Sequence, residues 1–117
     1  MAFKITSEKK DAIALVHVEG EIDMFTSPNL RDTLLPFFKP ETPAVIVDLS
    51  GVTFMDSSGI ATLVEGLQWS KKEGRKFILA GLGETVFNAL SLTKLDNVFS
   101  IEPDANAALE GLAGNTA

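Results

Sequence analysis

Two adjacent serines that directly follow an aspartate are the residues of this chain best placed to do chemistry. They lie in residues 55–59 (MDSSG), which we call the elbow. A serine at a helix N-terminus can cap the free backbone N–H groups of the first turn. The same N–H groups and the positive end of the helix dipole would stabilise a phosphate added to a serine. We therefore expect the function of the chain to lie at Asp56, Ser57 and Ser58.

The segments on both sides of the elbow predict how it is positioned. Residues 45–49 form a short apolar run rich in β-branched side chains, bounded by Pro43 and by Ser50, which is typical of a strand buried on both faces. After the elbow, apolar residues recur at helical spacing and predict a buried stripe of Ile60, Leu63, Val64 and Leu67. The elbow is thus expected to join the end of a buried strand to the start of a helix.

The remaining segments predict an α/β domain with the order ββαβαβαβα. A short strand with Phe3 and Ile5 is expected before a turn at residues 7–11, and further strands at 12–18, 76–80 and 98–101. Helices are expected from Pro28, with Ser27 as the N-cap, over 84–92 and after Asp104. Pro36 predicts a kink or an end of the first helix near Leu35. Alternating strands and helices favour a mixed, mostly parallel sheet of about five strands with about four helices, in which the first two strands form an antiparallel hairpin.

Composition limits the classes of function. The 117 residues suffice for one domain, residues 1–117, with a real core. A net charge of -6 and a pI of about 4.6 argue against a nucleic-acid partner. The absence of cysteine excludes a disulfide framework and a thiolate site. No membrane-length apolar run or signal peptide is visible, so a cytoplasmic protein without membrane contact is expected. The sequence suggests no cofactor or metal.

The polar residues could in principle support two other kinds of chemistry, a serine hydrolase site or a metal site. A serine hydrolase would need a G-x-S-x-G elbow, whereas the chain lacks the first glycine, and His17 lies far away in a strand pattern. Asp23, Asp48 and Asp56 would hold a divalent ion only if the fold gathered them, and Asp48 is expected to pair locally.

Residues 47–59 (VDLSGVTFMDSSG) resemble the signature of the STAS family of anti-sigma factor antagonists, also called anti-anti-sigma factors. The resemblance extends to residues 20–23 (GEID), to Thr26 and to residues 74–80, whereas residues 34–38 are less typical. It implies a STAS-like binding module rather than an enzyme. In that family the unmodified antagonist binds an anti-sigma factor, itself an ATP-binding serine kinase, and so frees a sigma factor. The kinase phosphorylates the serine after the aspartate, here Ser57, and a metal-dependent phosphatase removes the phosphate.

The resemblance also implies a surface that binds the partner kinase. Asp23 is expected to end a strand beside the elbow and to position the kinase–nucleotide complex, while Ser58 is expected to cap the helix. Trp69 is expected opposite the buried stripe, facing solvent with Thr62, unless a neighbouring helix or loop covers it. The expected partner-binding residues are Asp23, Thr26, Asp56, Ser58, Gly59, Thr62 and Trp69.

Two alternative functions remain open at this point. One is a STAS subunit of a lipid ABC transporter, which would dock on the transporter ATPase without control by a kinase. The other is the serine hydrolase considered above.

Overall fold

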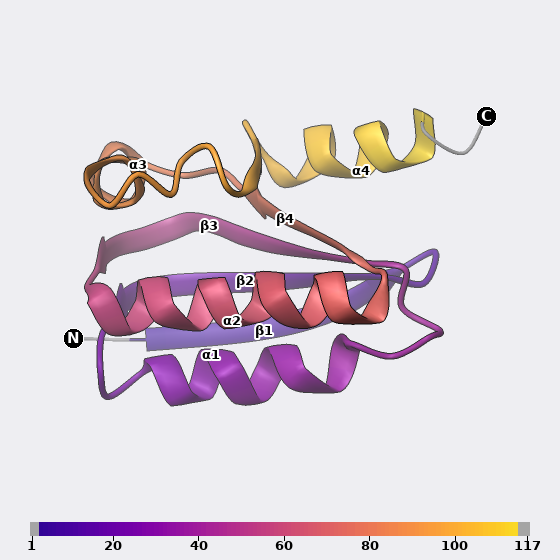
Figure 1. The fold of residues 1–117 in the computed structure, drawn as a ribbon, viewed down its shortest axis with the longest axis horizontal. Helices are drawn as coiled ribbons and strands as arrows, with labels where there is room; N and C mark the ends of the chain where they lie inside the picture. Colours follow the sequence, from indigo (N-terminus) through magenta and orange to yellow (C-terminus); the bar gives the residue numbers. More distant parts are fainter. Residues whose placement is uncertain (1–2, 115–117) are drawn as a thin grey trace.

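A five-stranded sheet forms the middle of the molecule in the computed structural model, which describes residues 3–114 (Figure 1). The strands lie side by side in chain order, and β1 pairs antiparallel with β2, while the other neighbours pair in parallel. The predicted mixed, mostly parallel sheet is confirmed. The strands are β1 (Phe3–Lys10), β2 (Ile13–Ile22), β3 (Ala44–Met55), β4 (Lys76–Ala80) and β5 (Ser100–Glu102).

The helices follow the predicted order along the chain. Pro36 ends the first helix as expected, since a proline has no backbone N–H to donate, and a single 3-10 turn follows. The first helix begins at Ser27, one residue earlier than predicted, so Thr26 and not Ser27 holds the N-cap position. The helical segments are α1 (Ser27–Leu34), η1 (Leu35–Phe37), α2 (Ser57–Glu73), α3 (Glu84–Leu92) and α4 (Ala105–Gly114).

Apolar residues on the two faces of the sheet form two separate clusters. The larger cluster joins one face to α1, α2 and α3, through residues such as Val16, Val47 and Leu63. The smaller one joins the other face to α4 and includes Leu15, Ile46 and Ala108. Successive residues of β2 and β3 alternate between the two clusters, because side chains in a strand point to opposite faces in turn. Strand β3 is therefore buried on both sides over residues 45–49, as its apolar run predicts, and β2 contributes to both clusters as well.

Strand β3 is longer than the sequence pattern predicts. It does not stop at Ser50 but continues to Met55, still paired with β2. The pairing shifts register twice, between His17 and Glu19 and again between Gly20 and Glu21. Such bulges let a strand continue through residues that break the alternation. As a result, the elbow begins at the last pair of the two strands.

Helix α2 lies closest to the sheet through small residues, while the predicted stripe packs against the same core cluster beside them. Its buried residues are Gly59, Thr62, Leu63, Gly66 and Ser70. Of the predicted stripe only Leu63 is fully buried, and the larger apolar residues beside it are half-buried. Glycine allows this close approach, since a Cβ atom on Gly66 would lie 2.7 Å from Cζ of Phe77.

The contact between Gly66 and Phe77 can be tested with a single methyl group. Gly66→Ala should lower the free energy of unfolding by about 1–2 kcal/mol, because overpacking costs about 1–3 kcal/mol and outweighs the better helix propensity of alanine, about 1 kcal/mol. Urea denaturation measures the difference. Gly111→Ala in α4 is the control: it adds the same methyl group with no atom within 4 Å and should be neutral or stabilising. Equal stability of the two variants would contradict the close approach.

Candidate functional site

Ser57 is the first residue of α2 and is exposed at the end of the sheet. The preceding strand residue, Met55, pairs with Ile22 of β2, and the backbone N–H of Asp56 donates to the carbonyl oxygen of Ile22 over 3.1 Å. Within residues 3–114, no group of the chain forms a hydrogen bond with the Ser57 hydroxyl. The elbow therefore presents an accessible hydroxyl on a fixed backbone.

The N-cap of α2 is Asp56 and not a serine. Its Oδ1 accepts hydrogen bonds from the backbone N–H groups of Ser58, over 2.9 Å, and of Gly59, over 3.4 Å. The expectation that Ser58 caps the helix is wrong, since its hydroxyl donates to the same Asp56 oxygen. A carboxylate at this position can accept several donors at once. These hydrogen bonds, foremost that from the Ser58 hydroxyl, lower the pKa of Asp56, so the elbow carries a negative charge at neutral pH.

Asp23 and Thr26 organise the turn between β2 and α1. Oδ1 of Asp23 accepts from the backbone N–H groups of Phe25, over 2.9 Å, and of Thr26, over 3.1 Å. The Thr26 hydroxyl accepts from the N–H of Asp23 and donates to the carbonyl oxygen of Glu21. The backbone N–H of Met24 helps to lower the pKa of Asp56, and the hydrogen bond from Asp56 to Ile22, just before the turn, joins the turn to the elbow. Asp23 thus has a structural role in the turn, and its role toward a kinase stays a prediction.

Three exposed apolar side chains lie beside the elbow, and sequence reasoning missed them. Met24 is 66% exposed, Phe25 80% and Phe54 43%. Met24 and Phe25 belong to the turn after Ile22, which accepts a hydrogen bond from Asp56, and Phe54 lies near the end of β3. We call them the apolar rim. They belong to no periodic stripe, so the only sequence clue was the presence of large apolar residues in a turn. Exposed aromatic and methionine side chains around an accessible residue are typical of an interaction surface.

Gly59 and Thr62, which were expected at the partner surface, are buried. A Cβ atom on Gly59 would lie 2.7 Å from side-chain atoms of both Ile22 and Met55. Thr62 is 5% exposed, and its hydroxyl donates to the carbonyl oxygen of Ser58. The helical-wheel placement of Thr62 on the solvent side was wrong because small residues turn this face toward the sheet. Both residues hold α2 in place.

Trp69 is half-buried, so the expectation of a solvent-facing ring is corrected in favour of the covered alternative. The Phe38 ring meets it edge-on with 5.6 Å between centroids, and the guanidinium carbon of Arg31 lies 5.5 Å from its centroid. Arg31 also reaches Glu65, with 3.4 Å between Nε and Oε2. The segment around α1 lies beside α2 and supplies this cover, which the sequence of α2 cannot reveal.

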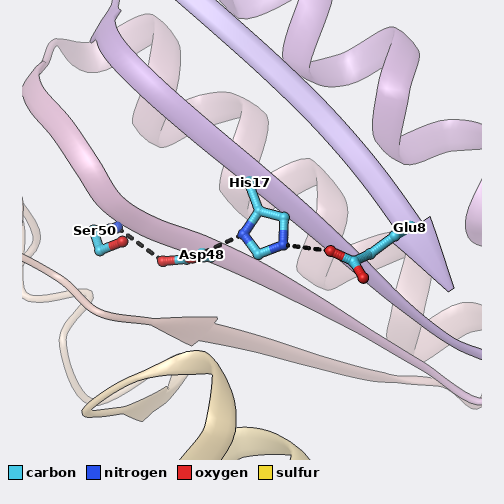
Figure 2. A network of polar contacts seen from close by, with 4 residues as sticks. All are labelled: Glu8, His17, Asp48 and Ser50. Atoms are coloured by element: carbon cyan, nitrogen blue, oxygen red, sulfur yellow. Dashed lines mark hydrogen bonds and ion pairs between the residues drawn. The ribbon is translucent and has the colours of Figure 1, made fainter. Parts of the chain in front are cut away.

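His17 takes part in a network of side chains across three strands, which Figure 2 shows. Its Nδ1 lies 2.9 Å from Oδ2 of Asp48 and its Nε2 lies 3.1 Å from Oε2 of Glu8. The hydrogen bond to Asp48, helped by Glu8, raises the pKa of His17 in spite of partial burial. Burial opposes ionisation of Asp48, but hydrogen bonds from Ser50 and His17 outweigh it and lower its pKa. The bond from the Ser50 N–H is the local pairing expected for Asp48, whereas its contact with His17 of the neighbouring strand was not predicted.

His17 and Asp48 take part in this network and not in the elbow. Both ring nitrogens of His17 face carboxylates, so the ring does not serve as a base for Ser57. Asp48 does not join Asp23 and Asp56, and residues 3–114 contain no group of three His, Asp or Glu side chains arranged to hold a metal ion. In the described part of the chain, no helix is both long and apolar enough to span a bilayer.

The sheet order, the helix after β3 and the capped elbow define a STAS domain. The family model described as the STAS domain matches residues 4–108, and the chain belongs to this family.

Its relatives include proteins named for a regulatory role. The chain is 28% identical over 87 residues to the anti-sigma-B factor antagonist of Listeria monocytogenes, covering 74% of this chain and 76% of that protein. It is 26% identical over 101 residues to that of Staphylococcus aureus, covering 86% and 94%. The crystal structure of an anti-sigma factor antagonist from Mycobacterium paratuberculosis superposes with a TM-score of 0.84 at 31% identity, covering 94% of this chain and 93% of that one.

The His17 network predicts how stability depends on pH. Because the folded pKa of His17 is raised, its contribution to stability is fully present below the unfolded pKa of about 6.5 and is lost as pH rises through the folded value. Urea denaturation of wild type and His17→Gln should show the largest difference near pH 6 and a small one near pH 9. Glu8→Gln should remove only part of this pH-dependent stabilisation by His17, since Glu8 is exposed. The same difference at both pH values would contradict the assignment.

Proposed function

We propose that this protein is an anti-sigma factor antagonist that binds an anti-sigma factor in its unphosphorylated state and so frees a sigma factor. The observation that carries the proposal is the exposed Ser57 hydroxyl, without a partner in residues 3–114, next to the exposed apolar rim of Met24, Phe25 and Phe54. The names of the relatives in Listeria, Staphylococcus and Mycobacterium support it. We propose a cytoplasmic location and no cofactor.

We further propose that phosphorylation of Ser57 switches binding off. A phosphate adds a charge of about -1.5 to -2 at neutral pH. The N–H groups of Ser58 and Gly59 are already bonded to Asp56, so the phosphate would share the helix N-terminus with a carboxylate. The helix dipole still favours a negative charge there, and Ser57 makes no side-chain contact that its modification would break. The free fold should therefore survive.

The effect of the phosphate falls on the complex instead. A partner that covers the apolar rim would have to desolvate a dianion beside the Asp56 carboxylate. Like-charge repulsion and desolvation would both oppose binding. The kinase in this proposal is the anti-sigma factor itself, and a metal-dependent serine phosphatase restores the binding form.

The first test identifies the phosphorylated residue. After incubation with ATP and a candidate anti-sigma factor, a histidine-kinase-like ATPase from the same organism, phosphosite mapping should find the phosphate on Ser57. Ser57→Ala should stay folded and take up none. Ser58→Ala should still be phosphorylated, although the loss of the bond from its hydroxyl to Asp56 should lower stability slightly. Phosphate on Ser58 of the wild type would overturn the assignment.

The second test measures the affinity of the switch. Ser57→Asp should bind the same ATPase at least tenfold more weakly than wild type, or about 1.4 kcal/mol, because it places a carboxylate at the covered position. The loss should be smaller than that caused by phosphate, since a carboxylate has about half the charge. Isothermal titration calorimetry decides between these outcomes. Asn106→Asp, which adds a carboxylate to the first turn of α4, should bind like wild type.

The same titration examines the other proposed contacts. Asp23→Asn keeps an acceptor oxygen for Phe25 and Thr26, so weaker binding at an unchanged melting temperature would support a direct role of the Asp23 charge. Equal affinity of wild type, Ser57→Asp and phosphorylated protein would rule out a switch at the elbow. That outcome would favour docking on a transporter ATPase without control by a kinase.

A further inference from the structure

The end of the sheet opposite the elbow carries most of the positive charge of an acidic protein. Here β1 ends, β3 and β4 begin and α2 terminates, as the right-hand side of Figure 1 shows. The chain has ten Lys and Arg residues and a net charge of -6. Six of these cations gather at this end: Lys9, Lys10, Lys71, Lys72, Arg75 and Lys76. The proposed switch uses none of them.

Two neighbouring cavities open between these cations and α4. The larger has a volume of about 750 Å³ and is lined mainly by apolar residues, among them Ile13, Ala44, Leu109 and Leu112. The smaller, of about 340 Å³, lies where Lys71 and Arg75 meet the start of β4. Lys76 and Leu112 line both cavities, so the two adjoin at this pair of side chains. Their size is that of sites for small organic ligands.

The packing of α4 and β5 explains why the cavities are open. Ala108 is the fully buried residue of α4, while Leu109 and Leu112 are only partly covered. Strand β5 pairs with β4 from Ile78 onward, so Lys76 and Phe77 at the start of β4 have no partner in β5. The apolar side of α4 and the free edge of β4 thus face the same space.

The charges of the two cavities differ. The larger one is lined by Lys10 and Lys76 and also by Asp11 and Glu110, so its charges balance. The smaller one is lined by Lys71, Arg75 and Lys76 against a single carboxylate, Glu102. An anionic group is therefore favoured in the smaller cavity, and an uncharged apolar group in the larger.

The Arg75 side chain gives a second, independent reason for an anion in the smaller cavity. Its Nε is buried and has no hydrogen-bond partner, the only buried side-chain nitrogen or oxygen in that state among residues 3–114. Leaving a buried donor unpaired costs about 1–3 kcal/mol, and more for a charged group. A carboxylate matches the planar donor edge of a guanidinium, with two parallel hydrogen bonds. Arg75 lines the smaller cavity, so its guanidinium is placed to pair with a carboxylate bound there.

We propose that these two cavities together bind a long-chain carboxylate, that is, a fatty acid. The carboxylate group pairs with Arg75 and is attracted by Lys71 and Lys76. The alkyl chain passes Leu112 and lies in the larger cavity against Leu109. This site is at the opposite end of the molecule from the elbow, and the inference does not depend on the proposed switch.

Titration of the full chain with sodium dodecanoate, kept below its micellar concentration, tests the proposal. Calorimetry should give one site per chain, and NMR should show shifts at Ile13, Leu109 and Leu112. Acetate, which has the head group alone, and dodecanol, which has a neutral head, should each bind at least tenfold more weakly. No binding, equal binding of dodecanol, or shifts confined to Met24 and Phe25 of the apolar rim would overturn it.

Variants separate the site from general affinity for fatty acids. Arg75→Met should weaken dodecanoate binding at least tenfold, and it should not lower the melting temperature of the ligand-free protein because Nε has no partner to lose. Lys72→Met removes a neighbouring cation that lines neither cavity and should bind normally. Leu112→Asp places a charge where the two cavities adjoin and should abolish dodecanoate binding. Unchanged affinity of Arg75→Met or of Leu112→Asp would refute the proposal.

Discussion

The parallel pairing of β2 with β3 is the constraint on which the candidate site depends. The pairing persists through two register shifts and ends with Ile22 beside Met55 and a hydrogen bond from Asp56 to Ile22. It therefore fixes two chain segments relative to each other: the turn after β2 and the N-terminus of α2. Without that last pair, neither the accessible serine nor the apolar rim would have a defined position.

Asp56 extends this constraint into the loops. Its carboxylate caps α2 and accepts the Ser58 hydroxyl, while its backbone N–H donates to Ile22 just before the neighbouring turn. The elbow is consequently preorganised, and Ser57 alone among the three central residues has a side chain without a partner in the described chain. A modification of Ser57 should thus alter what can bind the surface and leave the fold intact. This division is what a reversible binding switch requires.

The two ends of the domain differ in chemistry although α2 extends from one to the other. At the elbow α2 begins among carboxylates and exposed apolar side chains, and at its other end Ser70 and Lys71 line a cavity surrounded by cations. Small residues along α2 hold it close to the sheet between these ends. The length of β5 and the shallow packing of α4 decide how open the second end is.

The sequence by itself determined the order of elements, the break at Pro36, the bounds of β4 and α3, and the position of Ser57 at a helix start, because periodicity and turn residues act locally. It did not determine the length of β3, the face that α2 buries, the cover over Trp69, the cap by Asp56 or the unpaired Nε of Arg75. Each of these depends on contacts between segments distant in the chain. Bulges, small residues at a close approach and a neighbouring helix decide them, and only the tertiary structure brings those together.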